Sequence, residues 1–432
     1  MFGRGVRAIV AATAIVSTLA VPAQAFTFGP ERRVAGPYTW NPGKSLAVTD
    51  ARLLSIWASD CPPPKGICAT DGGARMGVFV QRSAADARPP SWGKPLRLSQ
   101  STVQAERPSI AADGTTVIAS WVTQRSYEHY KPSGPRVLWI RVSASEGKRW
   151  RTPVRITAPS GRVDYPRVAA AKGRLFVVWT NADTGAIRIA WSDDLGAHWA
   201  KARIGSTTSR PLGAKEGYAG FPDVGASDTN VAVAWLSSDT GGQQVVTSAS
   251  GGGDLASATP TQLTAVSPND GQHYPAVGAS PDAADPRLVI AYSASDHLEL
   301  RTFDGGGLAP PTTAFTWNQQ ISGVRYDGGY GPAVIPTSGS GIAIAVAACR
   351  PNPNVANPCN PLATGARIDI LYRSSPDGTT WDPALRLTNA PTSGYRIFDE
   401  PSLARNGAIQ RVSYDRYERT FAKYDVAMRS GT

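Results

Sequence analysis

One pattern recurs along the chain: a proline opens an apolar run, a second apolar run ends in Trp or Tyr, and a Gly-Trp turn follows. The opening prolines are Pro108, Pro166, Pro222, Pro275, Pro332 and Pro401. A repeat of roughly 55 residues with several short strands per unit is typical of a β-propeller, in which each repeat forms one radial blade. The repeat therefore constrains the architecture before any single residue is considered.

Each unit contains four strand-like runs, and the second run is the most regular. The second runs are Leu53–Trp57, Thr116–Trp121, Leu175–Trp179, Val231–Trp235, Leu288–Tyr292, Ile342–Ala348 and Ile409–Tyr414. They are short, β-branched and often apolar on both faces, as expected for strands inside packed blades. We predict an all-β fold, a seven-bladed β-propeller; a six-bladed ring with one irregular unit is the alternative.

The two ends of the chain predict how the ring closes. The last unit ends at Val426–Met428 without a fourth strand. Near the N-terminus, Phe28 and Arg33-Val34 repeat the spacing that Trp150 and Arg155-Ile156 show in a complete unit. We therefore predict that residues 26–35 supply the N-terminal strand closing the last blade, which removes an exposed sheet edge.

The first 25 residues have the composition of a signal peptide. Arg4 and Arg7 precede the apolar run Ala8–Val21, and Ala23-Gln24-Ala25 forms a small-residue cleavage site. The apolar run is too short for a stable membrane span. We expect a secreted, extracellular protein whose single β-propeller domain covers residues 26–432.

The four cysteines form two local pairs, Cys61 with Cys68 and Cys349 with Cys359. An even number of cysteines at short spacing in an exported chain predicts disulfides, each closing a Pro-rich loop. Neither pair has the neighbouring His or Cys that a zinc site requires, so no metal site and no cofactor are predicted.

The formal net charge of +11 comes from scattered basic residues, many at repeat positions. No Lys/Arg-rich run is present, so nucleic acid is not an expected partner, whereas an acidic glycan is compatible with the charge. We expect a monomer whose partner is an extracellular glycan or polysaccharide.

A turn motif links the repeats to a known superfamily. The segment Ser192 to Trp199 reads Ser-x-Asp-x-Gly-x-x-Trp, the segment Ser374 to Trp381 is a close variant, and those beginning at Ser143 and Ser248 are degenerate. Asp and Ser side chains can bond the turn's own backbone, and Gly supplies a positive φ. These segments resemble the Asp-boxes of the sialidase-like (BNR repeat) β-propeller superfamily, which implies a carbohydrate-active propeller with the turns on the face away from the site.

The sequence departs from that superfamily where its sialidases carry their chemistry. They have an Arg-Ile-Pro motif in the first blade, three arginines for the substrate carboxylate, an Asp acid/base and a Tyr–Glu nucleophile pair. Here the first unit reads Tyr38 to Gly43 without such an Arg, and Tyr395-Arg396-Ile397-Phe398 is only an echo of the motif before the last unit. The resemblance therefore implies no full sialidase catalytic set.

Candidate site residues lie on the loops that enter each blade and on those joining its second and third strands, because these loops share one face around the axis. The catalytic candidates are Glu106, Asp164, Arg325, Tyr326, Asp327 and Glu400. The ligand-binding candidates are Trp40, His129, Tyr130, Tyr330 and Arg396. Tyr165, Phe221 and Tyr274 precede blade prolines, and we interpret them as packing residues.

Three classes of function fit this set. A glycan-binding or glycan-cleaving propeller would use paired carboxylates from Glu106, Asp164, Asp327 and Glu400. A polysaccharide lyase would use Tyr or His to remove a proton beside a uronate carboxylate that Arg neutralises, with His129, Tyr130, Arg325 and Tyr326 as candidates. A lectin-like or protein-binding propeller would have no catalytic residues. The first class is the primary prediction.

Overall fold

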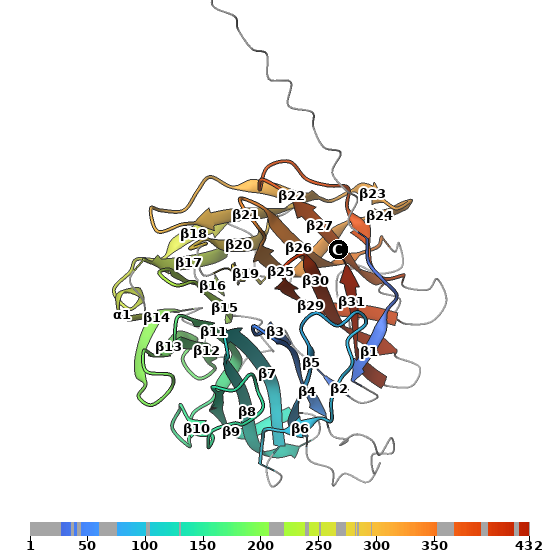
Figure 1. Cartoon of the computed structure of the whole chain (residues 1–432). Coiled ribbons are helices and arrows are strands. Elements are labelled where there is room, and N and C mark those ends of the chain that lie inside the picture. The colour runs from blue at the N-terminus through green and yellow to red at the C-terminus, as the bar shows by residue number, and fades with distance from the viewer. Residues whose placement is uncertain are drawn as a thin grey trace, which may run out of the picture.

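The computed structural model is an almost entirely β structure whose sheets are arranged as seven blades around one axis. It describes residues 27–35, 39–40, 45–59, 76–100, 104–128, 131–206, 220–237, 242–249, 252–264, 274–280, 282, 285–294, 296–351, 367–389, 396–418 and 423–431. In Figure 1 the blades follow one another around the centre in chain order. The predicted seven-bladed propeller is confirmed.

Every blade has four antiparallel strands, which we group by distance from the axis. The innermost strands are β3 (Leu46–Val48), β7 (Gln104–Asp113), β11 (Val163–Ala171), β15 (Gly220–Ala226), β19 (Ala276–Ala279), β25 (Gly328–Pro336) and β29 (Arg396–Asn406). The second strands are β4 (Arg52–Ser59), β8 (Thr116–Glu128), β12 (Arg174–Asn181), β16 (Val231–Ser237), β20 (Leu288–Ser293), β26 (Ile342–Cys349) and β30 (Ile409–Glu418).

The outer half of each blade consists of a third and a fourth strand, and most of the fourth strands are short. The third strands are β5 (Gly77–Ala84), β9 (Lys131–Ser143), β13 (Ala186–Ser192), β17 (Gly242–Ser248), β21 (His297–Phe303), β27 (Ile368–Ser375) and β31 (Lys423–Gly431). The fourth strands are β6 (Leu96–Arg97), β10 (Val154–Arg155), β14 (Ala200–Ser206), β18 (Thr261–Thr264), β22 (Thr312–Thr316), β28 (Leu385–Arg386) and β1 (Arg32–Ala35).

Four described elements lie outside this repeat. β2 (Thr39–Trp40) pairs with the end of β4, and β23 (Gln319–Ile321) with β24 (Val324–Tyr326) forms a hairpin between the fifth and sixth blades. The short helix α1 (Gly252–Leu255) follows β17. No helix among the described residues is both long and apolar enough to cross a membrane.

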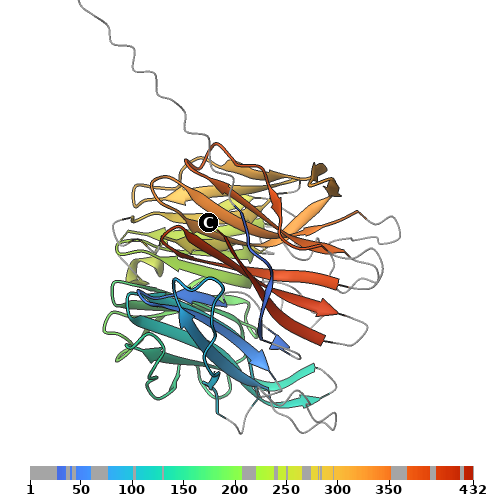
Figure 2. The ribbon, with the colours of Figure 1, turned by 45° about the vertical axis from the view of Figure 1, so that its right-hand side comes forward.

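The N-terminal strand closes the ring, as predicted. β1 pairs antiparallel with β31, with Arg32 opposite Met428 and Ala35 opposite Val426, and Phe28 bridges to Gly431. Figure 2 shows β1 running beside β31 at the edge of the last blade. The first and last parts of the chain thus share one sheet, and β1 covers the edge that β31 would otherwise expose.

Neighbouring blades pack face to face through their apolar side chains. One cluster, for example, joins Phe176 and Val178 of the third blade to Val233 and Trp235 of the fourth. The repeat-position tryptophans Trp57, Trp121, Trp179 and Trp235 are all buried, as expected for strands inside packed blades. Close approach near the axis requires small residues, because a Cβ at Gly278 would lie 1.9 Å from the carbonyl oxygen of Val334.

Many basic side chains bind main-chain carbonyls of an adjacent blade. Arg141 Nη1 in the second blade donates to Leu98 O in the first at 3.1 Å, and Arg174 Nη2 in the third donates to Ser227 O in the fourth at 2.9 Å. The same kind of contact joins Arg151 to Leu195, Lys201 to Ile156, Arg287 to Thr337, Arg373 to Ala314 and Arg411 to Ala85. Part of the positive charge therefore has a structural use between blades.

The predicted disulfides fall largely outside the described residues, which exclude Cys61, Cys68 and Cys359. Cys349 ends β26, is fully buried and is disulfide-bonded. The two pairings stay predictions, as does the signal peptide over residues 1–25.

Candidate functional site

The innermost strands share a backbone irregularity just before the repeat proline. Arg107, Tyr165 and Phe221 have φ values of 53°, 48° and 40°, and the strand pairing slips at each of these positions. A positive φ is uncommon for residues other than glycine and turns the side chain away from the regular alternation of the strand. The bulge thus points one side chain per blade toward its neighbour around the axis.

These side chains form a continuous stack, which we call the aromatic arc (Arg107, Tyr165, Phe221 and Tyr274). The guanidinium carbon of Arg107 lies 4.1 Å from the Tyr165 ring centroid. Tyr165 and Phe221 have centroids 3.9 Å apart, and Phe221 and Tyr274 have centroids 5.0 Å apart at an interplanar angle of 18°. The arc crosses four consecutive blades and gives the entry end of the axis a fixed rim.

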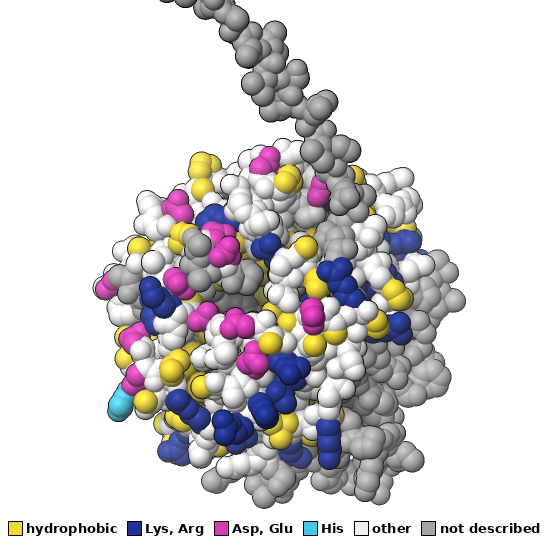
Figure 3. Space-filling view, viewed as in Figure 1, with side chains coloured by type: hydrophobic (Ala, Val, Ile, Leu, Met, Phe, Trp, Pro, Cys, Tyr) yellow, Lys and Arg dark blue, Asp and Glu magenta, His cyan; other side chains and the backbone are white. Residues whose placement is uncertain are grey.

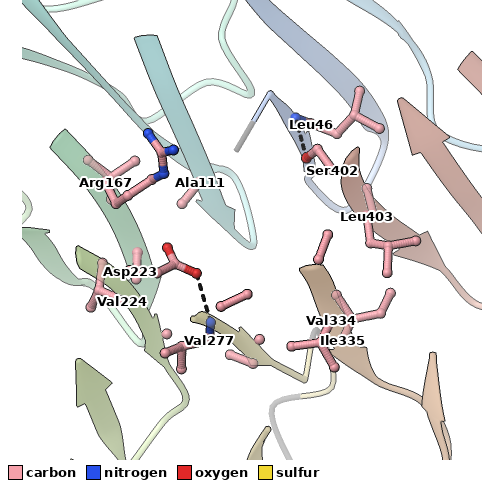
Figure 4. Close-up of a pocket in the computed structure, with 18 of the residues that line it drawn as sticks. Leu46, Ala111, Arg167, Asp223, Val224, Val277, Val334, Ile335, Ser402 and Leu403 are labelled. Carbon is pink, nitrogen blue, oxygen red and sulfur yellow. Dashed lines mark hydrogen bonds between the residues drawn. The ribbon is translucent and has the colours of Figure 1, made fainter. Parts of the chain in front are cut away.

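The axis itself holds a cavity of about 200 Å³ lined by the innermost strands of all seven blades. Its lining is mostly Ala, Val, Ile, Leu and Gly, with Arg167 and Asp223 among its few charged residues. Figure 4 shows Asp223 reaching from β15 to the N–H of Val277 in β19, at 2.7 Å, and Ser402 reaching the N–H of Leu46. Ligand pockets are usually larger, about 300–1,000 Å³. The axial cavity is therefore smaller than most ligand pockets.

A group of four charged side chains lies beside the arc, between the second and third blades. We call it the carboxylate cluster (Glu106, Arg107, Arg136 and Asp164). Asp164 Oδ1 lies 2.6 Å from Arg107 Nη1, and its Oδ2 lies 3.0 Å from Arg136 Nη1. One carboxylate thus joins two guanidinium groups that come from another blade, and the sequence-predicted residues Glu106 and Asp164 are brought together.

Glu106 is the buried acid of this cluster. Its side chain is 2% exposed, and Oε1 has no hydrogen-bond partner among the described residues. Burial raises the pKa of Glu106, and the charge of Asp164 raises it further, while Arg107 and Arg136 act in the opposite direction. A carboxyl group whose proton is retained by burial, beside a carboxylate held by arginines, is the arrangement that acid–base chemistry requires.

Arg325 and Asp327 lie together on the inserted hairpin. Arg325 Nε is 2.9 Å from Asp327 Oδ1, and Arg325 Nη2 donates to Asn318 Oδ1 at 2.9 Å. In Figures 1 and 2 the β23–β24 hairpin lies at the outer rim of the ring, whereas β7 and β11 lie across the axis from it. The structure therefore does not bring this pair together with Glu106 and Asp164.

Tyr326 belongs to a buried network beneath the hairpin. Its hydroxyl donates to Asp369 Oδ2 at 2.8 Å, and Arg350 Nε donates to the same oxygen at 2.7 Å. Thr388 Oγ1 donates to Asp369 Oδ1 at 3.2 Å. Both Tyr326 and Asp369 are 0% exposed, and burial raises the pKa of Tyr326 well above its ordinary range. This network fixes the hairpin onto the sixth blade.

The structure describes few side-chain contacts for the remaining predicted site residues. Tyr330 is buried in β25. Trp40 lies in β2, and Arg396 and Glu400 lie in β29, with side chains outside what the structure describes. His129 and Tyr130 lie outside the described residues.

Sequence reasoning missed Arg136, which lies on the same sheet as Glu106. Gln124 lies opposite Arg136 in the strand register and is 2% exposed, and neither polar atom of its amide has a partner among the described residues. The sequence does contain a sign of Arg136. It alternates with Leu138 and Ile140 along one strand, so all three side chains lie on the same buried face, where a charged residue is unusual.

The predicted Asp turns are at the opposite end of the blades from the carboxylate cluster. In the third blade, Ala170, Leu175 and Ser192 are aligned at one end of the sheet, and Asp164 and Thr180 at the other. Ser192 Oγ accepts from Gly196 N at 2.8 Å, and Asp194 Oδ1 accepts from His198 N at 2.9 Å. The turn is thus built by its own side chains, as its residue types predict.

The axis opens at this turn end into a second cavity of about 400 Å³. Its acidic lining residues are Asp50, Asp113, Asp228 and Asp282. Figure 3 shows acidic side chains around a hollow at the centre of the view. Within the described parts of the chain, no group of three or more His, Cys, Asp or Glu side chains is placed to hold a metal ion.

Comparisons with known proteins give similarity at the level of structure only. No protein-family model matches the chain, and no curated protein matches it. An ulvan lyase of a polysaccharide lyase family, solved with bound -[GlcA(1-4)Rha3S]-, is 11% identical, with a TM-score of 0.50 over 91% of this chain and 94% of that one.

Two sialidase structures are similar at lower scores. A leech intramolecular trans-sialidase is 10% identical with a TM-score of 0.47, over 91% of this chain and 68% of its own. A Trypanosoma rangeli sialidase is 10% identical with a TM-score of 0.45, over 94% of this chain and 59% of its own. At such identities the likeness establishes the fold and not the reaction. By its fold, this chain is a seven-bladed β-propeller similar in structure to the ulvan lyase.

Proposed function

We propose that this protein is an exported propeller that binds or cleaves extracellular carbohydrate at the entry end of its axis. The proposed site is the carboxylate cluster together with the adjoining aromatic arc. The signal-peptide pattern supports export, and the fold supports a rigid ring of loops around one mouth.

One observation carries the proposal: a buried Glu106 with a free Oε1 lies in the electrostatic field of Asp164, Arg107 and Arg136. Glycosidases use two carboxyl groups in different protonation states, one as acid and the other as nucleophile or base. Glu106 would give a proton to the leaving oxygen, and Asp164, which is paired with Arg107 and Arg136, would be the second carboxyl group. Arg107 and Arg136 would stabilise anionic groups of the substrate.

The two arginines also favour a second candidate reaction, cleavage of a uronate polymer by a lyase. A lyase needs cations to neutralise the uronate carboxylate while a base removes the neighbouring proton. Arg107 and Arg136 meet the first requirement, and Tyr165 lies against Arg107. The identity of the product separates this reaction from hydrolysis.

The proposal is tested by screening the purified full chain on neutral, sialylated, uronate-containing and sulfated glycans. Binding, release of reducing ends and ultraviolet absorbance of unsaturated uronates are measured together. Whichever of the three signals the wild type gives is expected to fall at least tenfold in Glu106→Gln, because this substitution removes a proton donor or changes a hydrogen-bond partner. Reducing ends without new absorbance indicate hydrolysis, both signals together indicate a lyase, and binding alone indicates a lectin.

Glu146→Gln is the matched control. Glu146 belongs to the same blade as Glu106, but its Oε1 accepts from Thr49 and Ala51 at the turn end of the sheet. It is expected to leave glycan binding and turnover unchanged. Equal effects of both substitutions, or no response to any glycan class, would overturn the proposed function.

A further inference from the structure

The seam at which the first and last blades meet contains a separate cavity of about 320 Å³. It is enclosed by the N-terminal segment before and within β1, by the loop Arg88–Pro90 and by the end of β31. In Figure 2, β1 and β31 run side by side along this seam. The volume falls within the usual range for small-ligand pockets.

The lining of this seam pocket is basic and polar. Its charged residues are Arg32 and Arg88, both exposed, and it also presents Ser430 and Thr27. No Asp or Glu is among the described residues that line it. The Oγ atom of Ser430 has no hydrogen-bond partner among the described residues. The pocket therefore offers donors and positive charge without a neutralising acid of its own.

Arg411 adds a third positive charge next to the pocket. It lies opposite Ser430 in the strand register and is 0% exposed. Its Nη2 donates to Ala85 O at 2.6 Å and to Ala87 O at 3.2 Å, while Nε and Nη1 have no partner in the described part of the chain. Burial, followed by the charge of Arg88, lowers the pKa of Arg411 to about 10.

Two acids, Glu31 and Asp86, belong to the segments around this pocket. The Glu31 carboxylate accepts from the Tyr414 hydroxyl at 2.7 Å. Asp86 attracts Arg411 electrostatically, but its side chain is exposed to solvent. A buried guanidinium beside a second cation is costly unless an anion compensates it.

We propose that the seam pocket binds an oxyanion, a sulfate or phosphate group, between Arg32, Arg88 and Ser430. Arg411 supplies positive charge from beneath and is a positioning residue through its bonds to the loop that carries Arg88. Guanidinium groups bind tetrahedral oxyanions through short, charge-assisted hydrogen bonds. The group comes either from free inorganic anion or from a sulfated polysaccharide. Since the pocket joins β1 to the first blade, the bound anion should hold the ring closed.

The experiment measures thermal unfolding of the full chain at increasing sodium sulfate and, separately, phosphate, with sodium chloride at matched ionic strength. We expect a saturable rise in Tm with sulfate or phosphate beyond the chloride series. In the double variant Arg32→Ala/Arg88→Ala, the apparent dissociation constant should weaken by about tenfold or more, because two charge-assisted contacts are lost. Ser430→Ala should weaken it less.

Arg149→Ala is the control, because Arg149 is an exposed arginine on the second blade whose removal changes the net charge without touching the seam. A rise in Tm that is non-saturable, or that is equal in the double variant and the wild type, reports only the general stabilisation by excluded salts and overturns the proposal. Absence of any rise also overturns it.

A second arm identifies the source of the group. Matched sulfated and desulfated oligosaccharides are titrated in chloride buffer. Competition of the sulfated chain with inorganic sulfate indicates a polysaccharide ligand, and a response to inorganic anion alone indicates a free ion. The Glu106→Gln variant should retain this response, so failure of the seam pocket and failure of the proposed catalytic site are distinguishable.

Discussion

The guanidinium carbon of Arg107 lies 4.1 Å above the ring centroid of Tyr165, the residue at the same repeat position in the next blade. The same guanidinium group reaches Asp164, so one side chain links the aromatic arc to the carboxylate cluster. A substitution in the aromatic arc is therefore expected to displace the charged groups of the carboxylate cluster.

The contribution of Glu106 to the free energy of unfolding should depend on pH. Burial is the main cause that raises its folded pKa above the ordinary 4.5. Its stabilising contribution is thus complete below 4.5 and is lost as pH rises through the folded value. Glu106→Gln, which cannot ionise, should gain stability relative to wild type as pH rises. Chemical denaturation from pH 4 to 8, in roughly unit steps, checks this sign.

The same titration should appear in turnover. If Glu106 donates a proton, the rate on a responsive glycan falls as pH rises through its folded pKa, and Glu106→Gln removes that limb of the profile. A wild-type profile that stays flat across that range would be inconsistent with an acid role for Glu106.

Gly331→Ala should destabilise the ring at the end of the aromatic arc. Gly331 has a φ of 56°, and an added Cβ would lie 2.8 Å from the Tyr274 hydroxyl. Arg107 has a similar φ of 53° at the same repeat position, so a residue with a side chain can adopt this conformation at a cost in strain. We expect a loss of about 2 kcal/mol, from left-handed strain together with displacement of Tyr274. Urea denaturation measures it, and an unchanged midpoint would contradict the close approach.

Asp369→Ala should be among the most damaging substitutions in the sixth blade. It leaves Arg350 buried without its carboxylate, which typically costs about 3–5 kcal/mol. Thr388→Val removes the hydrogen bond to Asp369 and the one that Thr388 Oγ1 accepts from the Ile370 N–H, and it should cost about 2 kcal/mol. Thermal and urea unfolding of both variants measure the two losses in the free energy of unfolding. Similar losses would mean that Asp369 is not the centre of the network.

Val34→Ala should weaken ring closure. Val34 is 8% exposed in β1 and packs in a cluster with Leu53 and Trp57 of the first blade and Met428 of the last. Removing two buried methyl groups should cost about 1.5 kcal/mol. Leu96→Ala, at a residue 44% exposed, should change the free energy of unfolding by less than about 0.5 kcal/mol. A reversed order in urea denaturation would argue against closure by β1.

Asp194→Asn should lower stability at neutral pH without affecting the carboxylate cluster. The His198 backbone N–H, and then Ser192, hold the pKa of Asp194 below its ordinary 3.8. A lowered folded pKa gives stabilisation that is present above 3.8 and is lost as pH falls toward the folded value. The difference in Tm between wild type and variant should therefore shrink below about pH 4. A difference that persists in acid would point to a different cause.

The sequence alone determined the number of blades and the closure of the ring. Both depend on local patterns: the repeat proline, the run ending in Trp57, Trp121 or Trp235, and the shared spacing of Phe28 and Trp150. Each pattern reflects burial or hydrogen bonding within one blade, which residues close in sequence decide. The same locality explains why the Ser192–Trp199 turn was predicted in detail.

Only the tertiary structure decided which candidates meet. Glu106 and Asp164 were both visible in the sequence, but Arg136, which bonds Asp164 from a third strand, was not identified. Arg325 and Tyr326 are neighbours in sequence, yet one forms an exposed ion pair and the other a buried bond to Asp369. Successive strand residues point to opposite faces, and partners from other blades are fixed by the curvature and packing of the ring. Those distances, and the burial that shifts the pKa of Glu106, exist only once the ring has closed.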